Sequence, residues 1–229
     1  MRCCRETSWL PGCLSMGVLR QHIVHIGEAV RDRSNLSVAV IGYPNTHTDA
    51  EHVTQGFGTD TEQACAPDYN LLRLLEHQGH QCRVFDVTAH RGMEEFIDLN
   101  EPLPVELQQQ FDLIVDSSCL EHCFNVAQAF RNLCDMTRVG GYVTTVAPIY
   151  IFNHGYYNIN PIMHQDGFEQ NGFEMKSQEL INNDGWLVTQ FSGKKSDPRV
   201  RTFVLTVAQK QQQQPFKWPI QTHKGKKFY

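Results

Sequence analysis

The stretch that decides the fold covers residues 111–148, FDLIVDSSCLEHCFNVAQAFRNLCDMTRVGGYVTTVAP. Its first five residues form an apolar, β-branched run, which is typical of a parallel strand covered on both faces. Gly140 and Gly141 are predicted to end the helix that follows, and residues 142–146 supply the next strand. The helix is predicted from an apolar stripe that recurs every three or four residues, at Leu120, Phe124, Ala127, Phe130 and Cys134.

Polar side chains stand between the first strand of this unit and its helix. Open α/β sheets bind their ligands at the carboxyl ends of strands, so these side chains mark a candidate site. They are Asp116, Ser117, Ser118, Glu121 and His122.

The rest of the chain extends this unit in both directions. Helices are predicted over residues 15–33, 67–78 and 161–169, and a long polar loop over residues 43–66. Strands alternating with helices, followed by strands joined by turns, predict an α/β fold with a mainly parallel sheet and an antiparallel edge. Further strands are predicted over residues 36–42, 81–87, 93–97, 173–181, 186–192 and 200–209.

Composition narrows the class of protein. The net charge of −5 argues against a nucleic-acid footprint over the whole surface, and no apolar run reaches the length of a membrane span. The cysteines follow no paired framework, which favours reduced thiols and a cytoplasmic location. A single domain is expected over residues 15–210, between a flexible extension over residues 1–14 and a polar, basic tail over residues 211–229.

Over residues 36–210 the order of motifs resembles that of class I S-adenosylmethionine-dependent methyltransferases. Asp86 in RVFDVT matches the family's acidic residue that holds the ribose hydroxyls, and Asp98 and Leu99 match the position beside the adenine. FDLIVDSSCLEH resembles the fourth-strand motif of the small-molecule enzymes, and VGGYVTTVAP resembles the fifth strand. The resemblance implies a Rossmann-like sandwich with a seven-stranded, mainly parallel sheet and helices on both faces. It also implies S-adenosylmethionine as cofactor and a small-molecule methyl acceptor.

The resemblance also indicates where the cofactor binds. For Asp86 the alternative role is to cap a turn, which is common for Asp after a strand. Three acidic residues that all end strands at one sheet edge would repel one another without a ligand or donors, which favours a site. The expected cofactor-binding residues are Gly42, Asp86, Asp98, Leu99, Asp116 and Ser117.

The chain departs from the family at the turn after the first strand. The family has a glycine-rich turn there, whereas this chain has Gly42 alone in IGYPN. Two hypotheses follow: a methyltransferase that binds its cofactor at a modified turn, or a catalytically inactive member of the fold that serves as a binding or partner subunit. A dehydrogenase-like enzyme is disfavoured because no G-x-G-x-x-G follows the first strand.

Two histidines are candidate catalytic residues. Methyl transfer needs an aligned nucleophile and often a base, and the imidazoles of His122 and His154 titrate near neutral pH. The alternative is that either histidine caps a helix or bonds to the backbone. Tyr156, Tyr157 and Asn158 are expected to bind the acceptor, or else to pack their loop onto the core as a lid.

No metal site is expected from the sequence. Cys119, His122 and Cys123 share one face of the predicted helix but lack a fourth ligand, and thiols in helices are commonly just buried. The pair Glu121-His122 is similar to one in metal-using RNA-end methyltransferases, but Ser118 stands where those enzymes carry another glutamate.

A nucleic-acid acceptor is also disfavoured. The loop of residues 116–119 lacks the Asn/Asp-Pro-Pro-aromatic signature of enzymes that methylate exocyclic amines on bases. The expected acceptor is therefore an oxygen or nitrogen of a small molecule, such as a sugar or a secondary metabolite. The sequence leaves the oligomeric state open.

Overall fold

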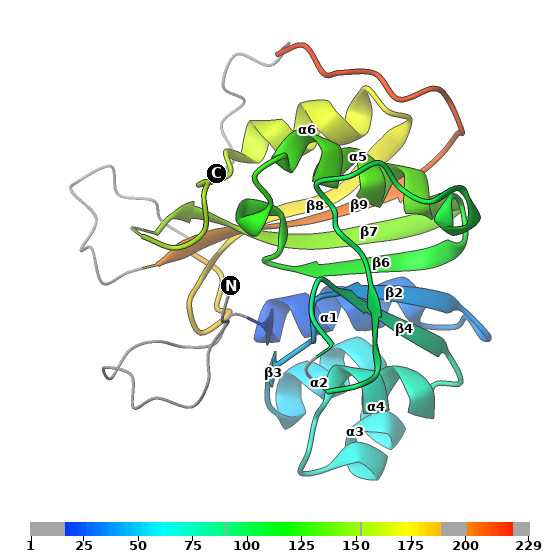
Figure 1. The fold of residues 1–229 in the computed structure, drawn as a ribbon. Helices are drawn as coiled ribbons and strands as arrows, with labels where there is room; N and C mark the ends of the chain where they lie inside the picture. Colours follow the sequence, from blue (N-terminus) through cyan, green and yellow to red (C-terminus); the bar gives the residue numbers. More distant parts are fainter. Residues whose placement is uncertain (1–16, 90, 152, 189–200, 222–229) are drawn as a thin grey trace.

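The computed structural model describes residues 17–89, 91–151, 153–188 and 201–221. Its main sheet lies between two layers of helices (Figure 1). The extension expected over residues 1–14 lies outside the described residues, as do residues 222–229 of the expected tail. Within the described part of the chain, no helix is both long enough and apolar enough to span a bilayer.

The elements of the fold follow in chain order. The main sheet contains β2 (Ser37–Ile41), β4 (Gln81–Asp86), β5 (Glu94–Phe96), β6 (Phe111–Ser117), β7 (Thr137–Tyr150), β8 (Phe173–Asn182) and β9 (Thr202–Lys210). A two-stranded sheet pairs β1 (Val18–Leu19) with β3 (Thr46–His47). The α-helices are α1 (Arg20–Val30), α2 (Ala50–Phe57), α3 (Thr59–Cys65), α4 (Leu71–His77), α5 (Val126–Met136) and α6 (Pro161–Glu169). Two 3₁₀ helices are η1 (Val105–Leu107) and η2 (Leu120–His122).

The main sheet has seven strands in the order β5-β4-β2-β6-β7-β9-β8. Strands β5, β4, β2, β6 and β7 pair in parallel, and β9 runs antiparallel to both of its neighbours, β7 and β8. Helices cover both faces, with α5 and α6 on one side and α1 and α4 on the other (Figure 1). The predicted α/β sandwich is confirmed. The antiparallel strand lies one position inside the edge.

The alternation of side chains along β2 builds two cores. Ala39 and Ile41 point into the cluster that contains α5, whereas Val38 and Val40 point into the cluster that contains α1 and α4. Successive side chains of a strand point to opposite faces, so a continuous apolar run is what a strand buried on both faces requires. The central strands are therefore fixed on both sides, and their carboxyl ends form a rigid edge.

The prediction of a long polar loop over residues 43–66 is wrong, because this segment contains β3, α2 and α3. The Asp49 side chain caps α2 by accepting a hydrogen bond from the backbone N–H of His52 at 3.2 Å. Val53 and Phe57 are buried on the inner face of the helix. The Thr, Gln and Glu residues of the outer face hide this short apolar stripe in the sequence.

The helix of the central unit begins later than predicted. Helix α5 starts at Val126, with Asn125 as its side-chain cap, and Phe124 is 73% exposed instead of belonging to the apolar stripe. Gly140 does not end the helix. It has φ of +81° within β7, where the pairing of β6 with β7 shifts register, and α5 ends at Met136.

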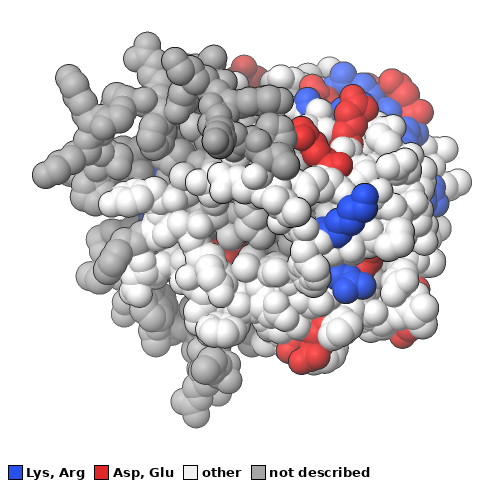
Figure 2. All heavy atoms as spheres, turned by 90° about the horizontal axis from the view of Figure 1, so that it is seen from above, with Lys and Arg blue, Asp and Glu red and all other residues white. Residues whose placement is uncertain are grey.

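Charged side chains are mixed on the surface. On the face shown in Figure 2, Lys and Arg side chains lie interspersed with Asp and Glu, and the described part of this face has no extended basic area. Part of the tail is ordered against α6, because Lys217 exchanges hydrogen bonds with the side chain of Asn171 at 2.7 and 3.0 Å. The domain boundaries expected at residues 14 and 210 remain predictions.

Candidate functional site

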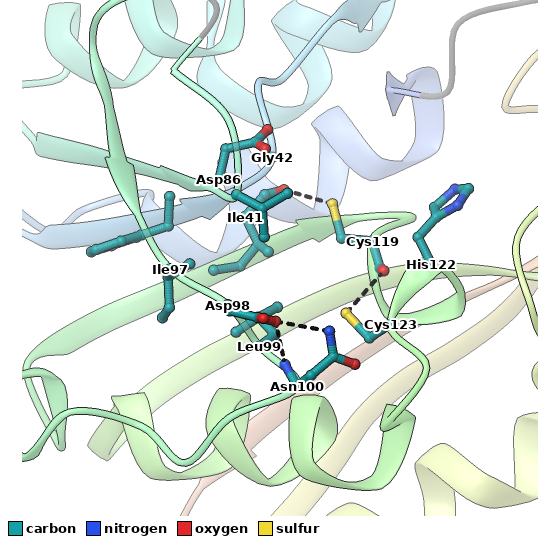
Figure 3. Close-up of a pocket in the computed structure, with 12 residues that line it drawn as sticks. Ile41, Gly42, Asp86, Ile97, Asp98, Leu99, Asn100, Cys119, His122 and Cys123 are labelled. Carbon is teal, nitrogen blue, oxygen red and sulfur yellow. Dashed lines mark hydrogen bonds between the residues drawn. The ribbon is translucent and has the colours of Figure 1, made fainter. Parts of the chain in front are cut away.

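A pocket of about 240 Å³ opens at the carboxyl ends of β2, β4 and β5, beside the loop that follows β6 (Figure 3). It lies where the strand order reverses between β2 and β6, the position at which open α/β sheets bind ligands. Its walls combine apolar side chains with two carboxylates and one amide. The lining residues are Ile41, Gly42, Phe85, Asp86, Val87, Ile97, Asp98, Leu99, Asn100, Cys119, His122 and Cys123.

The two pocket carboxylates are held by their own turns. Asp86 Oδ1 accepts hydrogen bonds from the backbone N–H and the hydroxyl of Thr88, both at 3.0 Å. Asp98 Oδ1 accepts from the backbone N–H and the side-chain amide of Asn100, at 2.9 and 2.8 Å. Asp86 therefore caps a turn and lines the pocket at once, and the cap fixes the direction in which the carboxylate points.

Asp116 and Ser117 are buried at the end of β6 and are not among the residues that line the pocket. The Asp116 carboxylate accepts hydrogen bonds from the backbone N–H of Cys119 at 3.0 Å and the hydroxyl of Thr145 at 2.6 Å. Burial, with the nearby Glu121, raises the pKa of Asp116 to about 7. Asp116 thus anchors the loop after β6 to β7.

The turn after β2 is packed tightly against that loop. Gly42 has φ of +72°, and its N–H donates to the carbonyl of Phe85 at 2.8 Å. A Cβ on Gly42 would lie 2.7 Å from the Sγ of Cys119, whose thiol donates to the carbonyl of Ile41 at 3.2 Å (Figure 3). Glycine is therefore required here both by the backbone conformation and by the close approach of the thiol.

The two predicted bases lie side by side around a buried carboxylate. The rings of His122 and His154 meet edge to face with centroids 4.8 Å apart. Glu121 Oε1 lies 3.9 Å from His122 Nε2 and 3.5 Å from His154 Nε2. Burial lowers the pKa of His122, with His154 adding to this and Glu121 opposing it. The sequence marked Glu121 among the polar side chains of the candidate site but gave it no role, and it placed neither Cys119 nor Cys123 in the pocket wall.

The predicted acceptor-binding residues lie outside the pocket lining. Tyr156 is 61% exposed and meets Phe124 edge to face, and the hydroxyl of Tyr157 donates to the carbonyl of Phe124 at 2.9 Å. Asn158 Oδ1 accepts from the N–H of Ile151 at 2.8 Å. These contacts fold the loop after β7 onto the segment between η2 and α5. The binding of an acceptor by this loop remains a prediction.

Solved structures share the arrangement of strands and helices. A putative methyltransferase from Bacillus halodurans is 12% identical, with a TM-score of 0.50 over 82% of this chain and 98% of that one. The putative methyltransferase solved with the Haloferax volcanii Trm112 methyltransferase activator is 10% identical, with a TM-score of 0.52 over 86% of this chain and 92% of that one. The chain has the class I methyltransferase fold. No protein-family model matches it, and no curated protein matches its sequence.

The class I methyltransferase fold does not by itself fix the reaction. The [4+2]-cyclase SpnF is 12% identical to this chain, with a TM-score of 0.50 over 83% of this chain and 80% of that one. A shared fold carries different chemistries, so the function has to be argued from the site.

A substitution at Gly42 tests whether the turn after β2 contacts the ligand of this pocket. Under the hypothesis of a methyltransferase, Gly42→Ala is expected to weaken the binding of S-adenosylmethionine about tenfold, because its Cβ collides with the thiol of Cys119 in the pocket wall. Gly79→Ala is the matched control, since Gly79 has φ of +79° but open space around its Cβ position. Both variants should lose about 1 kcal/mol of stability from backbone strain, and Gly42→Ala should lose more because of the collision with the thiol. Equal affinities for S-adenosylmethionine in calorimetry would show that the turn after β2 does not border the cofactor.

Proposed function

We propose that this protein is an S-adenosylmethionine-dependent methyltransferase that acts on a small molecule. The observation that supports it best is the meeting of Gly42, Asp86 and Asp98 in one pocket. They come from three different strand ends, at the carboxyl edge of a sheet with the methyltransferase strand order. A chance cap at one strand end would not bring an acid from β4 and another from beyond β5 into a common wall.

The pocket residues fit the parts of the cofactor. A carboxylate such as that of Asp86 can accept from both hydroxyls of a ribose, and its turn with Thr88 holds it ready. Ile97 and Leu99 offer apolar walls for a purine base, and Asp98 lies beside them. When bound, S-adenosylmethionine supplies an electrophilic methyl group on its sulfonium.

The histidines fit the role of bases. His122 lines the pocket and is half exposed, so a substrate proton can reach its ring. A lowered pKa keeps this imidazole neutral near pH 7, ready to accept a proton from an acceptor O–H or N–H as the bond to carbon forms. The buried Glu121 would stabilise the imidazolium that results, on His122 or on the adjoining His154.

A small-molecule acceptor fits the surface better than a nucleic acid. The net charge is −5, and the charged side chains on the described face in Figure 2 are of both signs. The oxygen or nitrogen acceptor stays part of the proposal, with a sugar or secondary metabolite as the expected class. We also place the protein in the cytoplasm, and the free thiols of Cys65, Cys82 and Cys134 support this.

Binding of the cofactor is the deciding test. We expect calorimetry to detect binding of S-adenosylmethionine and of its demethylated product, S-adenosylhomocysteine, each at one site per chain. Asp86→Asn should weaken both about tenfold, because the amide keeps the cap on Thr88 but removes the charge and one acceptor. Asp68→Asn, at an exposed side chain outside the pocket, should leave the affinity unchanged. No binding at millimolar ligand would contradict the proposal and favour a catalytically inactive binding subunit.

A further inference from the structure

A cluster of metal-ligand side chains lies next to the cofactor pocket. Glu121 and His122 are consecutive residues of η2, and His154 comes from the loop after β7. One ligand atom from each of the three lies within 4.8 Å of the others. His122 belongs both to this cluster and to the wall of the pocket.

Glu121 is the centre of the cluster and lacks a strong counter-charge. Its side chain is fully buried, and Ser118 donates a hydrogen bond to Oε1. Oε2 is buried and has no hydrogen-bond partner. Among the described residues, its ion-pair partners are His122 and His154 alone, with no Lys or Arg. Burying a carboxylate without a paired cation costs several kcal/mol, so a bound cation would stabilise this arrangement.

The Nε2 atom of His154 also lies at this position without a hydrogen-bond partner. It is buried, and the nearest carboxylate oxygen, Glu121 Oε1, is 3.5 Å away. That distance is too long for a hydrogen bond, but it suits two ligands of one ion. Ligands about 2.1 Å from a tetrahedral zinc ion lie roughly 3.4 Å apart.

The backbone holds the two segments together. The N–H of Tyr156 donates to the carbonyl of Glu121 at 2.7 Å. Gly155 has φ of +62°, and a Cβ there would lie 2.8 Å from both Cγ and the carbonyl oxygen of Glu121. The loop that carries His154 is therefore clamped onto η2, which places the ligands before any ion arrives.

We propose that Glu121, His122 and His154 bind a divalent first-row transition-metal ion, with zinc(II) as the reference ion. One carboxylate and two imidazoles form a donor set that such ions prefer, and it leaves at least one coordination position open. The thiols considered from the sequence are engaged elsewhere, since Cys119 donates to the carbonyl of Ile41 and Cys123 to that of Cys119. This donor set replaces the expectation of no metal.

The metal site also narrows the chemical class of the methyl acceptor. This step rests on the proposed function. Because His122 is shared between the cluster and the pocket, a ligand that completes the coordination lies beside the cofactor. With the ion bound, the ring of His122 is a metal ligand and accepts no proton, so the base role proposed above applies to the metal-free protein. In zinc sites with three protein ligands, the open position is taken by water or by a substrate atom that replaces it. The acceptor would therefore present a hydroxyl or carboxylate oxygen to the ion.

Metal binding can be tested without S-adenosylmethionine. The full chain, freed of metal with a chelator, is titrated with zinc(II), and we expect one tight site. Glu121→Gln and His154→Asn should each weaken it about 100-fold. His25→Asn is the matched control, because His25 also contacts two glutamates, at 3.2 and 3.1 Å, outside this cluster. Circular dichroism checks folding, and His154→Asn carries the test if Glu121→Gln does not fold.

Cobalt(II) then identifies the ligands, because thiolate ligands give an intense charge-transfer band that imidazole and carboxylate ligands lack. We expect visible d–d bands without that band, and their loss in His154→Asn. The inference is overturned if zinc binds equally well to the variants, if the thiolate band appears, or if Glu121 forms only an ion pair with a protonated histidine and no metal binds. A chain that binds zinc but not S-adenosylmethionine would contradict the proposed function and leave the metal site standing.

Discussion

Replacing Gly27 with alanine is expected to lower the free energy of unfolding by about 2 to 3 kcal/mol, against the trend of helix propensity. Gly27 in α1 faces Gly56 in α2. A Cβ on Gly27 would lie 2.6 Å from the carbonyl oxygen of Gly56 and closer still to its carbonyl carbon. A Cβ on Gly56 would in turn lie 2.8 Å from the carbonyl oxygen of Ile23. These neighbours are backbone atoms, so they cannot rotate away as a flexible side chain can.

The sign of the change in unfolding free energy shows whether the close packing of α1 on α2 outweighs helix propensity. Helix propensity alone predicts that alanine stabilises α1 by about 1 kcal/mol. Urea unfolding of Gly27→Ala therefore separates the two outcomes, with Glu28→Ala, at an exposed position of the same helix, as control. The control should change the free energy of unfolding by about 0.5 kcal/mol or less. A more stable Gly27→Ala protein would mean that α1 and α2 do not pack this closely.

The same contact explains why α2 escaped prediction. The strands of the main sheet and the leucine-rich helix α4 carry strong local patterns, so their positions follow from periodicity. The strand predicted over residues 186–192 is wrong at residues 186–188, which form only a single bridge from Leu187 to Ile181, and residues 189–192 lie outside the described residues. Helix α2 has a polar outer face, and Gly56 within it is a poor helix former. Its stability comes from packing on α1, a contact between segments far apart in the chain. Local sequence patterns do not report such contacts.

The residues of the candidate site also differ in how far the sequence could predict them. Asp86 and Asp98 were predictable because parallel strands bring their carboxyl ends to one edge whatever the details of packing. The role of Glu121 was not, because its burial depends on the loop of residues 153–156 folding back over η2. A glutamate is almost never fully buried without a partner, so sequence reasoning expects it at the surface.

His22 is a further residue whose burial the sequence does not reveal. Its burial leads to the second large predicted effect, a dependence of stability on pH. Its place on α1 gives no sign of deep burial in the sequence, yet its side chain is fully buried and Nε2 lies 3.0 Å from the Thr144 hydroxyl of β7. Burial, and then the nearby His25, lower the pKa of His22 from 6.5 to about 3. His164 repeats this on the opposite face of the sheet, beside the Thr206 hydroxyl, and burial lowers its pKa to about 4.

The direction of the pH effect follows from proton binding. Between pH 6.5 and about 3 the unfolded chain holds a proton on His22 and the folded chain does not. Stability is therefore lost as the pH falls through this window, and His22 contributes no pH dependence above it. At pH 4.5 the loss from His22 is about 2.7 kcal/mol, because one pKa unit corresponds to about 1.36 kcal/mol.

We therefore expect His22→Leu to resist acid better than the parent protein. Leucine cannot bind a proton, and the Thr144 hydroxyl keeps its hydrogen bond to the carbonyl of Ile114 at 3.4 Å. Urea unfolding at pH 7 and pH 4.5 should show a smaller loss of stability in the variant, by about 2 to 3 kcal/mol. His77→Gln, at an exposed position of α4, should behave like the parent. Equal losses in His22→Leu and the parent would mean that His22 is hydrated in solution, and α1 would then not be sealed against β7.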